Sequence, residues 1–352
     1  MLGLTNDAIA SRLKLSAMIK TRQELIEDPS DLRPHIVLLG AGASRAAFPN
    51  GDAAGRPLPV MDDLVDIVGL QPILEQTGLE DAREKNFELI YGQLTSEHTY
   101  AHKVKEIERR IDSYFAALSL PNQATLYDRL LVSLRPKDAV FTFNWDPFLF
   151  DAYQRNRSAV SLPEIFFLHG NVRIGACLDH DKWGARKDRC PQCLQQFSDV
   201  PLLYPIGQKD YSTNPYTQRN WHAAKILFRD AFTLTIFGYS APSSDKDAMG
   251  LLRSAWTGRS DRTFEHIEII DIAQQSFLYD HWSPFTPTHH YLFTRTFEQS
   301  RLARWPRRSC ESLMYPMTQG GPCEDFPLPT TESLAALQAF AVEIARHENS
   351  PA

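Results

Sequence analysis

Short and almost wholly apolar runs recur along the chain and are separated by stretches with helical periodicity. Runs of this kind are typical of strands that are buried on both faces, because helices cover both sides of a parallel sheet. The pattern therefore predicts an α/β fold with a parallel sheet. The predicted strands are 35–39, 138–143, 165–170, 233–237 and 266–270.

Helical patterns fill most of the remaining chain. Apolar residues recur among charges from Thr5 to about Asp28, which predicts an N-terminal amphipathic helix within residues 1–33. Residues 61–134 predict a helical insertion between the first two strands. Its two long helices are expected around Asp81–Leu94 and His98–Leu118, and further helices around Asp247–Trp256 and Thr331–His347.

Proline and glycine divide the chain further. Residues 48–59 hold six Pro, Gly or Asn residues and predict a loop. Residues 284–326 are rich in proline and basic residues, so an irregular segment is expected there. We therefore predict three parts, namely an N-terminal helix in 1–33, a core domain in 34–294 and a C-terminal extension in 295–352 that ends in a helix.

Composition excludes several classes of protein. The 352 residues are 43% hydrophobic and 23% charged, which is typical of a folded globular chain. A net charge of −6 supplies no positive field for a phosphate backbone, so no direct nucleic-acid ligand is expected. The chain has no apolar stretch of membrane-spanning length and no signal-peptide pattern at its start, so we expect a cytoplasmic protein that does not enter a membrane.

Three of the five cysteines lie close together with a histidine. Cys177 and His180 are separated by two residues, as are Cys190 and Cys193, and nine residues lie between the two pairs. Two pairs of this spacing suit a tetrahedral zinc ion, and four protein ligands leave no open position for catalysis. We predict a small module with structural zinc at about 175–197. A metal-free loop and a catalytic zinc remain as alternatives.

A glycine-rich turn follows the first strand. In Gly40-Ala41-Gly42-Ala43-Ser44, glycine would let a pyrophosphate approach the backbone at the start of a helix. The third glycine of the full dinucleotide fingerprint is replaced by Arg45. An ordinary turn between a strand and a helix explains the same residues.

Polar residues also follow the later strands, where parallel sheets bind ligands. Alternation at the end of the second strand would place Thr142, Asn144 and Asp146 on one side and Phe143 and Trp145 on the other. Asp146 could equally cap the next helix. His169 could be structural. Gly238 and Ser240 form a second small-residue turn, and Asp271 is either a ribose or adenine acceptor or a cap.

In order and spacing, the sequences GAGAS, TFNWD, LHG, the Cys/His insert and FGYS resemble the sirtuin (SIR2) family over residues 34–275. Asn86-Phe87-Glu88 is similar to an element of bacterial SIR2-like proteins. The resemblance implies a Rossmann-like NAD-binding domain with helices on both faces of the sheet and a small zinc-binding module. It also implies that NAD is cleaved at its nicotinamide–ribose bond.

The resemblance implies a role for each matching residue. His169 would be the catalytic imidazole, and Asn144 and Asp146 would hold the nicotinamide ribose and amide. Thr142 would also bind the cofactor. The NAD phosphates would contact Gly40, Ala41, Gly42 and Ser44, and the adenosine half would contact Gly238, Ser240 and Asp271.

Departures from the deacylase pattern favour one branch of the family. The segment RAAFPNGDAAGRPLP lacks the Asp-Phe-Arg of protein deacylases, and Phe143 and Trp145 are bulkier than their deacylase counterparts. These features resemble SIR2-like NAD hydrolases of bacterial anti-phage defence, in which water is the nucleophile. The alternatives are a protein deacylase or ADP-ribosyltransferase, and a sensor of NAD or ADP-ribose. The resemblance also implies control by a homo-oligomer or by a partner such as a HerA-type ATPase or an Argonaute-like protein.

Overall fold

The computed structural model describes residues 19–78, 86–205, 211, 214–241, 245–257, 266–285, 290–319 and 321–348. The predicted helix from Thr5 to Asp28 is described only in its last part, where α2 spans Arg22–Glu27 and begins with a Thr21–Glu24 capping box. Residues 1–18 lie outside the described residues.

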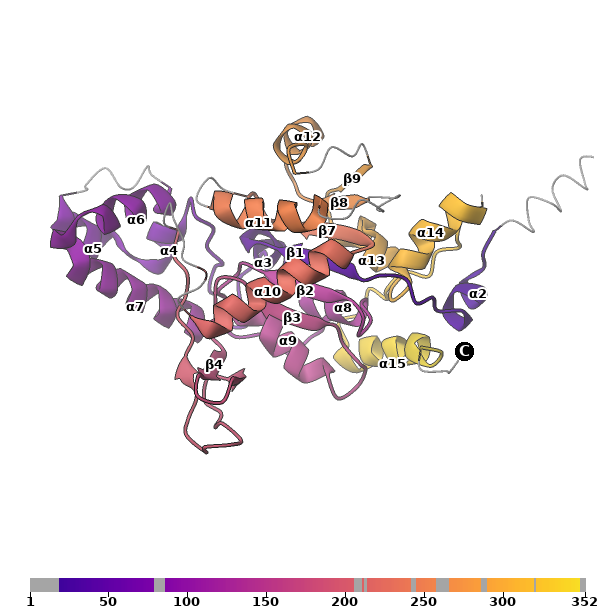
Figure 1. Ribbon diagram of the computed structural model, residues 1–352, viewed down its shortest axis with the longest axis horizontal. Coiled ribbons are helices and arrows are strands. Elements are labelled where there is room, and N and C mark those ends of the chain that lie inside the picture. Colours follow the sequence, from indigo (N-terminus) through magenta and orange to yellow (C-terminus); the bar gives the residue numbers. More distant parts are fainter. Residues whose placement is uncertain are drawn as a thin grey trace, which may run out of the picture.

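A six-stranded parallel sheet forms the centre of the molecule (Figure 1). Its strand order is β3-β2-β1-β7-β8-β9. The five predicted strands are confirmed, with ends that differ by a few residues at most. The strands are β1 (His35–Leu39), β2 (Ala139–Thr142), β3 (Glu164–Phe167), β7 (Thr233–Phe237), β8 (Ile267–Ile270) and β9 (Tyr291–Thr294).

Alternate residues of β1 contribute to two separate hydrophobic cores, one on each face of the sheet. Ile36 and Leu38 pack in the core that contains the apolar faces of α10 (Pro215–Asp230), α11 (Lys246–Thr257) and α12 (Gln275–Trp282). Val37 and Leu39 pack in the other core. That core includes residues of α3 (Ala41–Ala47), α8 (Leu126–Val132), α9 (Phe148–Asn156) and α15 (Leu334–Ala345). Helices therefore cover both faces, as predicted.

The helical insertion between β1 and β2 is confirmed. Its first part gathers at one end of the molecule (Figure 1). Helix α6 begins at Phe87, where the side chain of Asn86 accepts from the Glu88 N–H. Residues 81–85 of the helix predicted at Asp81–Leu94 lie outside the described residues. The α-helices are α4 (Leu64–Val68), α5 (Gln71–Leu74), α6 (Phe87–Ser96), α7 (Ala101–Ala117) and α8, with 3-10 turns at Glu75–Thr77 and His98–Tyr100.

The cysteine-rich insert forms a separate antiparallel sheet of three strands that extends away from the main sheet (Figure 1). Its strands are β4 (Ile174–Cys177), β5 (Lys182–Ala185) and β6 (Ser198–Asp199). Phe197 packs against two of its glycines, since an added Cβ would lie 2.7 Å from the Phe197 Cβ at Gly175 and 2.9 Å from the Phe197 ring at Gly184. Both positions therefore need glycine.

The expectation of an irregular segment at 284–326 is wrong in two places. Strand β9 adds to the edge of the sheet beside β8, and α14 spans Ser309–Gln319. Two shorter elements lie between them, a 3-10 turn at Phe297–Gln299 and α13 at Arg301–Arg304. Ion pairs of the fully buried Arg307 and Arg308 with Glu348 join this segment to the chain after α15. Among the described helices, none is long and apolar enough to cross a membrane.

Candidate active site

The polar strand ends converge on one cavity of about 300 Å³. Its walls come from β1, β2, β7 and β8 at their carboxyl ends, and also from the helical insertion and the chain after the cysteine-rich insert. Ten of the eleven residues predicted to bind or cleave NAD line it. They are Gly40, Ala41, Gly42, Ser44, Asn144, Asp146, His169, Gly238, Ser240 and Asp271.

The eleventh residue, Thr142, lies behind the wall. Its buried Oγ1 accepts the backbone N–H of Asn144 at 3.0 Å. Thr142 therefore fixes the turn that carries Asn144, and its side chain supports the cavity from outside.

Glycines at two strand ends let two turns pack backbone against backbone. The Gly40 N–H donates to the Phe237 carbonyl at 3.0 Å, and the Gly42 N–H donates to the Gly238 carbonyl at 2.9 Å. A Cβ on Gly238, whose φ is +59°, would lie 2.1 Å from the Ala43 nitrogen. These glycines, whose place after a strand is typical of pyrophosphate binding, therefore also have a packing role.

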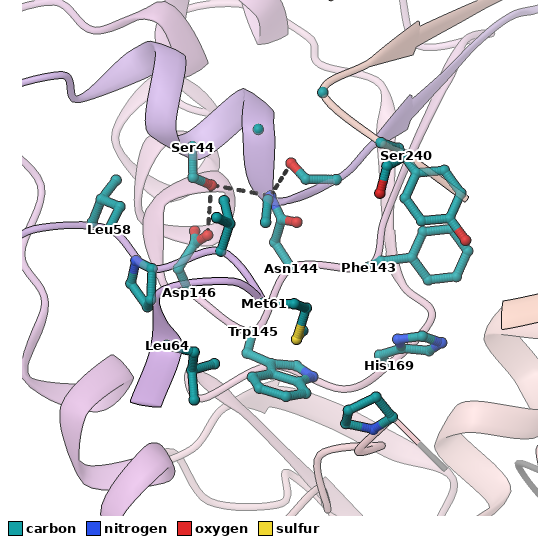
Figure 2. A pocket seen from close by; sticks show the side chains of 18 of the residues that line it. Ser44, Leu58, Met61, Leu64, Phe143, Asn144, Trp145, Asp146, His169 and Ser240 are labelled. Atoms are coloured by element: carbon teal, nitrogen blue, oxygen red, sulfur yellow. Dashed lines mark hydrogen bonds between the residues drawn. The ribbon is translucent and has the colours of Figure 1, made fainter. Parts of the chain in front are cut away.

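Ser44 is the centre of a buried hydrogen-bond network (Figure 2). Its hydroxyl donates to Asp146 Oδ2 at 2.6 Å and accepts from Asn144 Nδ2 at 3.0 Å. The same Asn144 nitrogen donates to the Gly40 carbonyl at 2.9 Å. Tyr127, from the helical insertion, lies 2.6 Å from Ser44 Oγ. The amide of Asn144 is therefore held in one orientation, with its oxygen on the side opposite these partners.

Asp146 is a buried carboxylate that caps a helix as well as lining the cavity. Its Oδ1 accepts from the Phe148 N–H at 3.2 Å, so the capping alternative is present together with the cavity position. Burial raises its pKa to about 6, against the opposing effect of the hydrogen bonds from Ser44 and Phe148. Its protonation therefore changes in a range close to neutral pH.

The predicted alternation of polar and aromatic side chains after β2 is wrong. Because the strand ends at Thr142, the period of two does not continue. Phe143 stacks on Tyr239 with ring centroids 4.4 Å apart, whereas Trp145 meets Phe115 edge to face at 5.7 Å. The two aromatic side chains belong to different hydrophobic cores, and both line the cavity.

His169 lies at the end of the cavity that Trp145 also borders (Figure 2). Its ring meets Phe143 edge to face at 4.6 Å and stacks on Tyr211 at 6.3 Å. It is 5% exposed. The following residue, Gly170, has a φ of +77°, and a Cβ there would lie 2.6 Å from the Pro201 carbonyl. Chain packing therefore fixes the position of the imidazole.

Trp145 contributes a hydrogen-bond donor that the sequence analysis did not identify. Its indole Nε1 is buried and has no hydrogen-bond partner in the described protein. The ring is held by Phe115 from α7 and by Tyr204, whose centroid lies 5.0 Å away. In Figure 2 this nitrogen points toward the His169 end of the cavity. A buried donor of this kind favours a ligand that supplies an acceptor.

The helical insertion supplies further polar groups to the wall. Asp62, Asn86 and Glu88 line the cavity, and Asn86 Nδ2 donates to Asp62 Oδ1 at 2.6 Å. Asn86-Phe87-Glu88 is the segment that is similar to an element of bacterial SIR2-like proteins. Among the described residues of the lining, the charged groups are carboxylates and none is Lys or Arg.

The four predicted zinc ligands come together. The ligand atoms of Cys177, His180, Cys190 and Cys193 all lie within 4.8 Å of one another. Cys177 Sγ is 3.7 Å from Cys193 Sγ and 3.4 Å from His180 Nδ1. Tetrahedral zinc with Zn–S bonds of about 2.3 Å requires sulfur atoms about 3.8 Å apart, so these residues fit the ion.

Cys310 lies outside this cluster. Its thiol is buried, which raises the pKa of the thiol to about 12.

Comparison with known proteins gives similarity to Sir2 structures. A Sir2 homologue variant in complex with ADP-ribose is 13% identical, with a TM-score of 0.42 over 83% of this chain and 98% of that chain. A Sir2 homologue with NAD is 13% identical, with a TM-score of 0.40 over 86% and 97%. A structure concerning the mechanism and regulation of Sir2 enzymes is 12% identical, with a TM-score of 0.38 over 99% and 100%. No family model matches the chain, and no curated protein matches it.

Proposed function

We propose that this protein binds NAD in the cavity and hydrolyses its nicotinamide–ribose bond. The observation that carries this proposal is the placement of a fixed amide, Asn144, and a buried imidazole, His169, on the walls of one cavity. Cleavage of this bond passes through an oxocarbenium-like state, so it requires accurate positioning of the ribose and a base near the nucleophile. Asn144 cannot titrate and would position the ribose, whereas His169 can accept a proton.

The nicotinamide group would occupy the end of the cavity near Trp145 and His169. Phe143 and Trp145 give this end flat apolar surfaces, Met61 adds an apolar thioether, and Trp145 Nε1 offers a donor to the carboxamide oxygen. Asp146, which also lines the cavity, would interact with the carboxamide nitrogen when it is ionised.

The remainder of NAD would extend along the glycine turns. The adenosine ribose would meet Ser240 and Asp271, and the phosphates would lie by Ala41 and Ser44. The N–H groups of Gly40 and Gly42 already donate to the chain at 237–238, so they shape this wall without donating to phosphate.

The reaction uses one water molecule. The water oxygen forms a bond to the ribose C1′, the bond from C1′ to the pyridinium nitrogen breaks, and its electron pair remains on nicotinamide. The water proton passes to His169. The products are nicotinamide, ADP-ribose and a proton.

Mass-spectrometric product analysis of the purified chain with NAD tests this proposal. Free ADP-ribose formed without any peptide supports hydrolysis. O-acetyl-ADP-ribose that forms only with an acetylated-lysine peptide would replace it with the deacylase alternative. Binding of NAD without any product would favour the sensor alternative. The variant His169→Ala should give no ADP-ribose and serves as the control.

The biological setting that we propose is bacterial anti-phage defence, on the basis of the sequence resemblance. An unrestrained NAD hydrolase would deplete the NAD of its own cell, so its activity must be controlled. We propose control by homo-oligomerisation or by a partner protein such as a HerA-type ATPase. Light scattering of the purified chain, alone and with such an ATPase, measures both kinds of assembly, and the NAD assay repeated on each species shows which one is active.

The proposed role of zinc is structural. With four protein ligands, the ion would join the end of β4 to the segment between β5 and β6 and would leave no position for substrate. Leu203 and Pro205, which follow this sheet, line the cavity. The zinc module would therefore fix one wall of the site without taking part in the reaction.

A further inference from the structure

Asp245 is a buried carboxylate that lines the cavity beside His169. It lies directly before α11 and is 4% exposed. Its Oδ1 is 3.8 Å from His169 Nε2. Its Oδ2 accepts the hydroxyl of Tyr239 at 2.8 Å. The three side chains therefore form a row, Tyr239–Asp245–His169, along one wall.

Aromatic packing fixes both ends of this row. Phe143 stacks on Tyr239 with centroids 4.4 Å apart, and it meets the His169 ring edge to face at 4.6 Å. The phenol of Tyr239 stays protonated because burial, together with the neighbouring Asp245, raises its pKa well above the ordinary value. Tyr239 therefore remains a hydrogen-bond donor to Asp245 near neutral pH.

We propose that Asp245 is a positioning residue that orients His169 and stabilises the imidazolium formed when water is deprotonated. This role rests on the proposed NAD hydrolysis. A positive charge that forms on a buried imidazole requires a nearby counter-charge, because the low dielectric of the interior penalises an isolated ion. In the described cavity wall, Asp245 is the carboxylate that lies beside Nε2 of His169.

The geometry assigns different tasks to the two ring nitrogens of His169. Nε2 faces Asp245, so Nδ1 is the atom that would take the proton from water. The separation of 3.8 Å is longer than a hydrogen bond but within the range of an ion pair. The attraction therefore increases at the step in which the proton arrives, and this favours the transition state over bound substrate.

The test compares Asp245→Asn and Tyr239→Phe with the wild type by steady-state kinetics with NAD. Asp245→Asn preserves the shape of the side chain but removes its charge, so we expect kcat to fall by about tenfold or more with KM nearly unchanged. Tyr239→Phe retains the ring and loses only the donor to Asp245, so a smaller fall in kcat is expected. Asp247→Asn is the matched control, because this acid lies exposed on α11 outside the cavity lining.

The pH–rate profile separates positioning from a merely structural role. The titratable groups described around His169 are Asp245 and the phenols of Tyr211 and Tyr239. The carboxylate of Asp247 acts electrostatically on the Tyr211 phenol, and that of Glu88 acts on the Tyr239 phenol. Loss of the adjacent negative charge makes the imidazole harder to protonate. The acid limb of kcat should therefore move to lower pH in Asp245→Asn and stay in place in Asp247→Asn.

Each result decides a separate point. Unchanged kcat and an unchanged acid limb in Asp245→Asn would overturn the role of Asp245 while leaving NAD hydrolysis intact. A rise in KM with no fall in kcat would make Asp245 a binding residue and would also overturn it. If the wild type neither binds nor cleaves NAD, the proposed function fails first, and this inference fails with it.

Discussion

The side-chain nitrogen of Asn144 lies 3.0 Å from Ser44 Oγ, although the two residues are separated by about 100 positions in the sequence. Ser44 comes from the helix after β1, and Asn144 comes from the turn after β2. Because β1 and β2 are adjacent and parallel, both turns lie at the same edge of the sheet. This contact makes the first two strand ends a single polar surface.

The role of Asn144 can be tested by Asn144→Ala. The change removes the group that would fix the ribose, so nicotinamide release should fall by about a hundredfold or more. It also leaves Ser44 and the Gly40 carbonyl without their donor, which should cost about 1–3 kcal/mol of unfolding free energy. Asn220→Ala is the control, because its Nδ2 donates to the Tyr216 carbonyl within α10. It should lose stability and retain activity, measured by nicotinamide release and thermal unfolding.

The close approach of the two glycine turns predicts a large effect of Gly238→Ala. The new Cβ would lie 2.1 Å from the Ala43 nitrogen at a φ of +59°, so the turns must separate. We expect a loss of more than about 3 kcal/mol in unfolding free energy. Gly250→Ala, at an exposed position of α11 with open space around it, should instead stabilise the protein by up to about 1 kcal/mol. Equal effects of the two changes, measured by chemical denaturation, would contradict the packing described for Gly238.

The raised pKa of Asp146 predicts a specific pH dependence. Its pKa is about 6 in the folded protein and 3.8 in the unfolded chain, so between these values the folded state binds the extra proton. The contribution of Asp146 to stability is therefore fully present below pH 3.8 and decreases as pH rises through 6, by about 3 kcal/mol in total. Asp146→Asn removes this titration. The unfolding free energy of Asp146→Asn minus that of the wild type, measured by denaturant titration, should be larger at pH 7.5 than at pH 4. A difference that does not change with pH would contradict the raised pKa.

Metal analysis of the purified protein should give about one zinc ion per chain. Cys190→Ser should lose the ion and the order of the three-stranded sheet, because binding of the metal and folding of the module are coupled. Cys323→Ser, at a half-buried thiol outside this cluster, should keep the zinc content unchanged. A stable wild-type protein with no bound metal would contradict the assignment.

Some elements were missed because their sequence pattern was weak or was not used. Helix α10 has a readable pattern, with Asn214 as its cap, Pro215 in its first turn and buried Trp221, Ala224 and Phe228 at helical spacing. Strand β9 has four half-exposed or exposed residues at the sheet edge, so it lacks the continuous apolar run that identified the other strands. Edge position, which depends on the whole sheet, explains why β9 was not predicted.

The sequence by itself determined five strands of the main sheet, the helical insertion, the cluster of three cysteines and a histidine, and ten of the residues around the cavity. It could do so because buried parallel strands require apolar runs, and ligand-binding residues of such sheets follow the strand ends. Only the tertiary structure showed the separate packing of Phe143 and Trp145, the buried indole donor and the proximity of Asp245 to His169. These relationships depend on the directions that side chains take after the strands end, where no periodicity constrains them, and on contacts between segments that are distant along the chain.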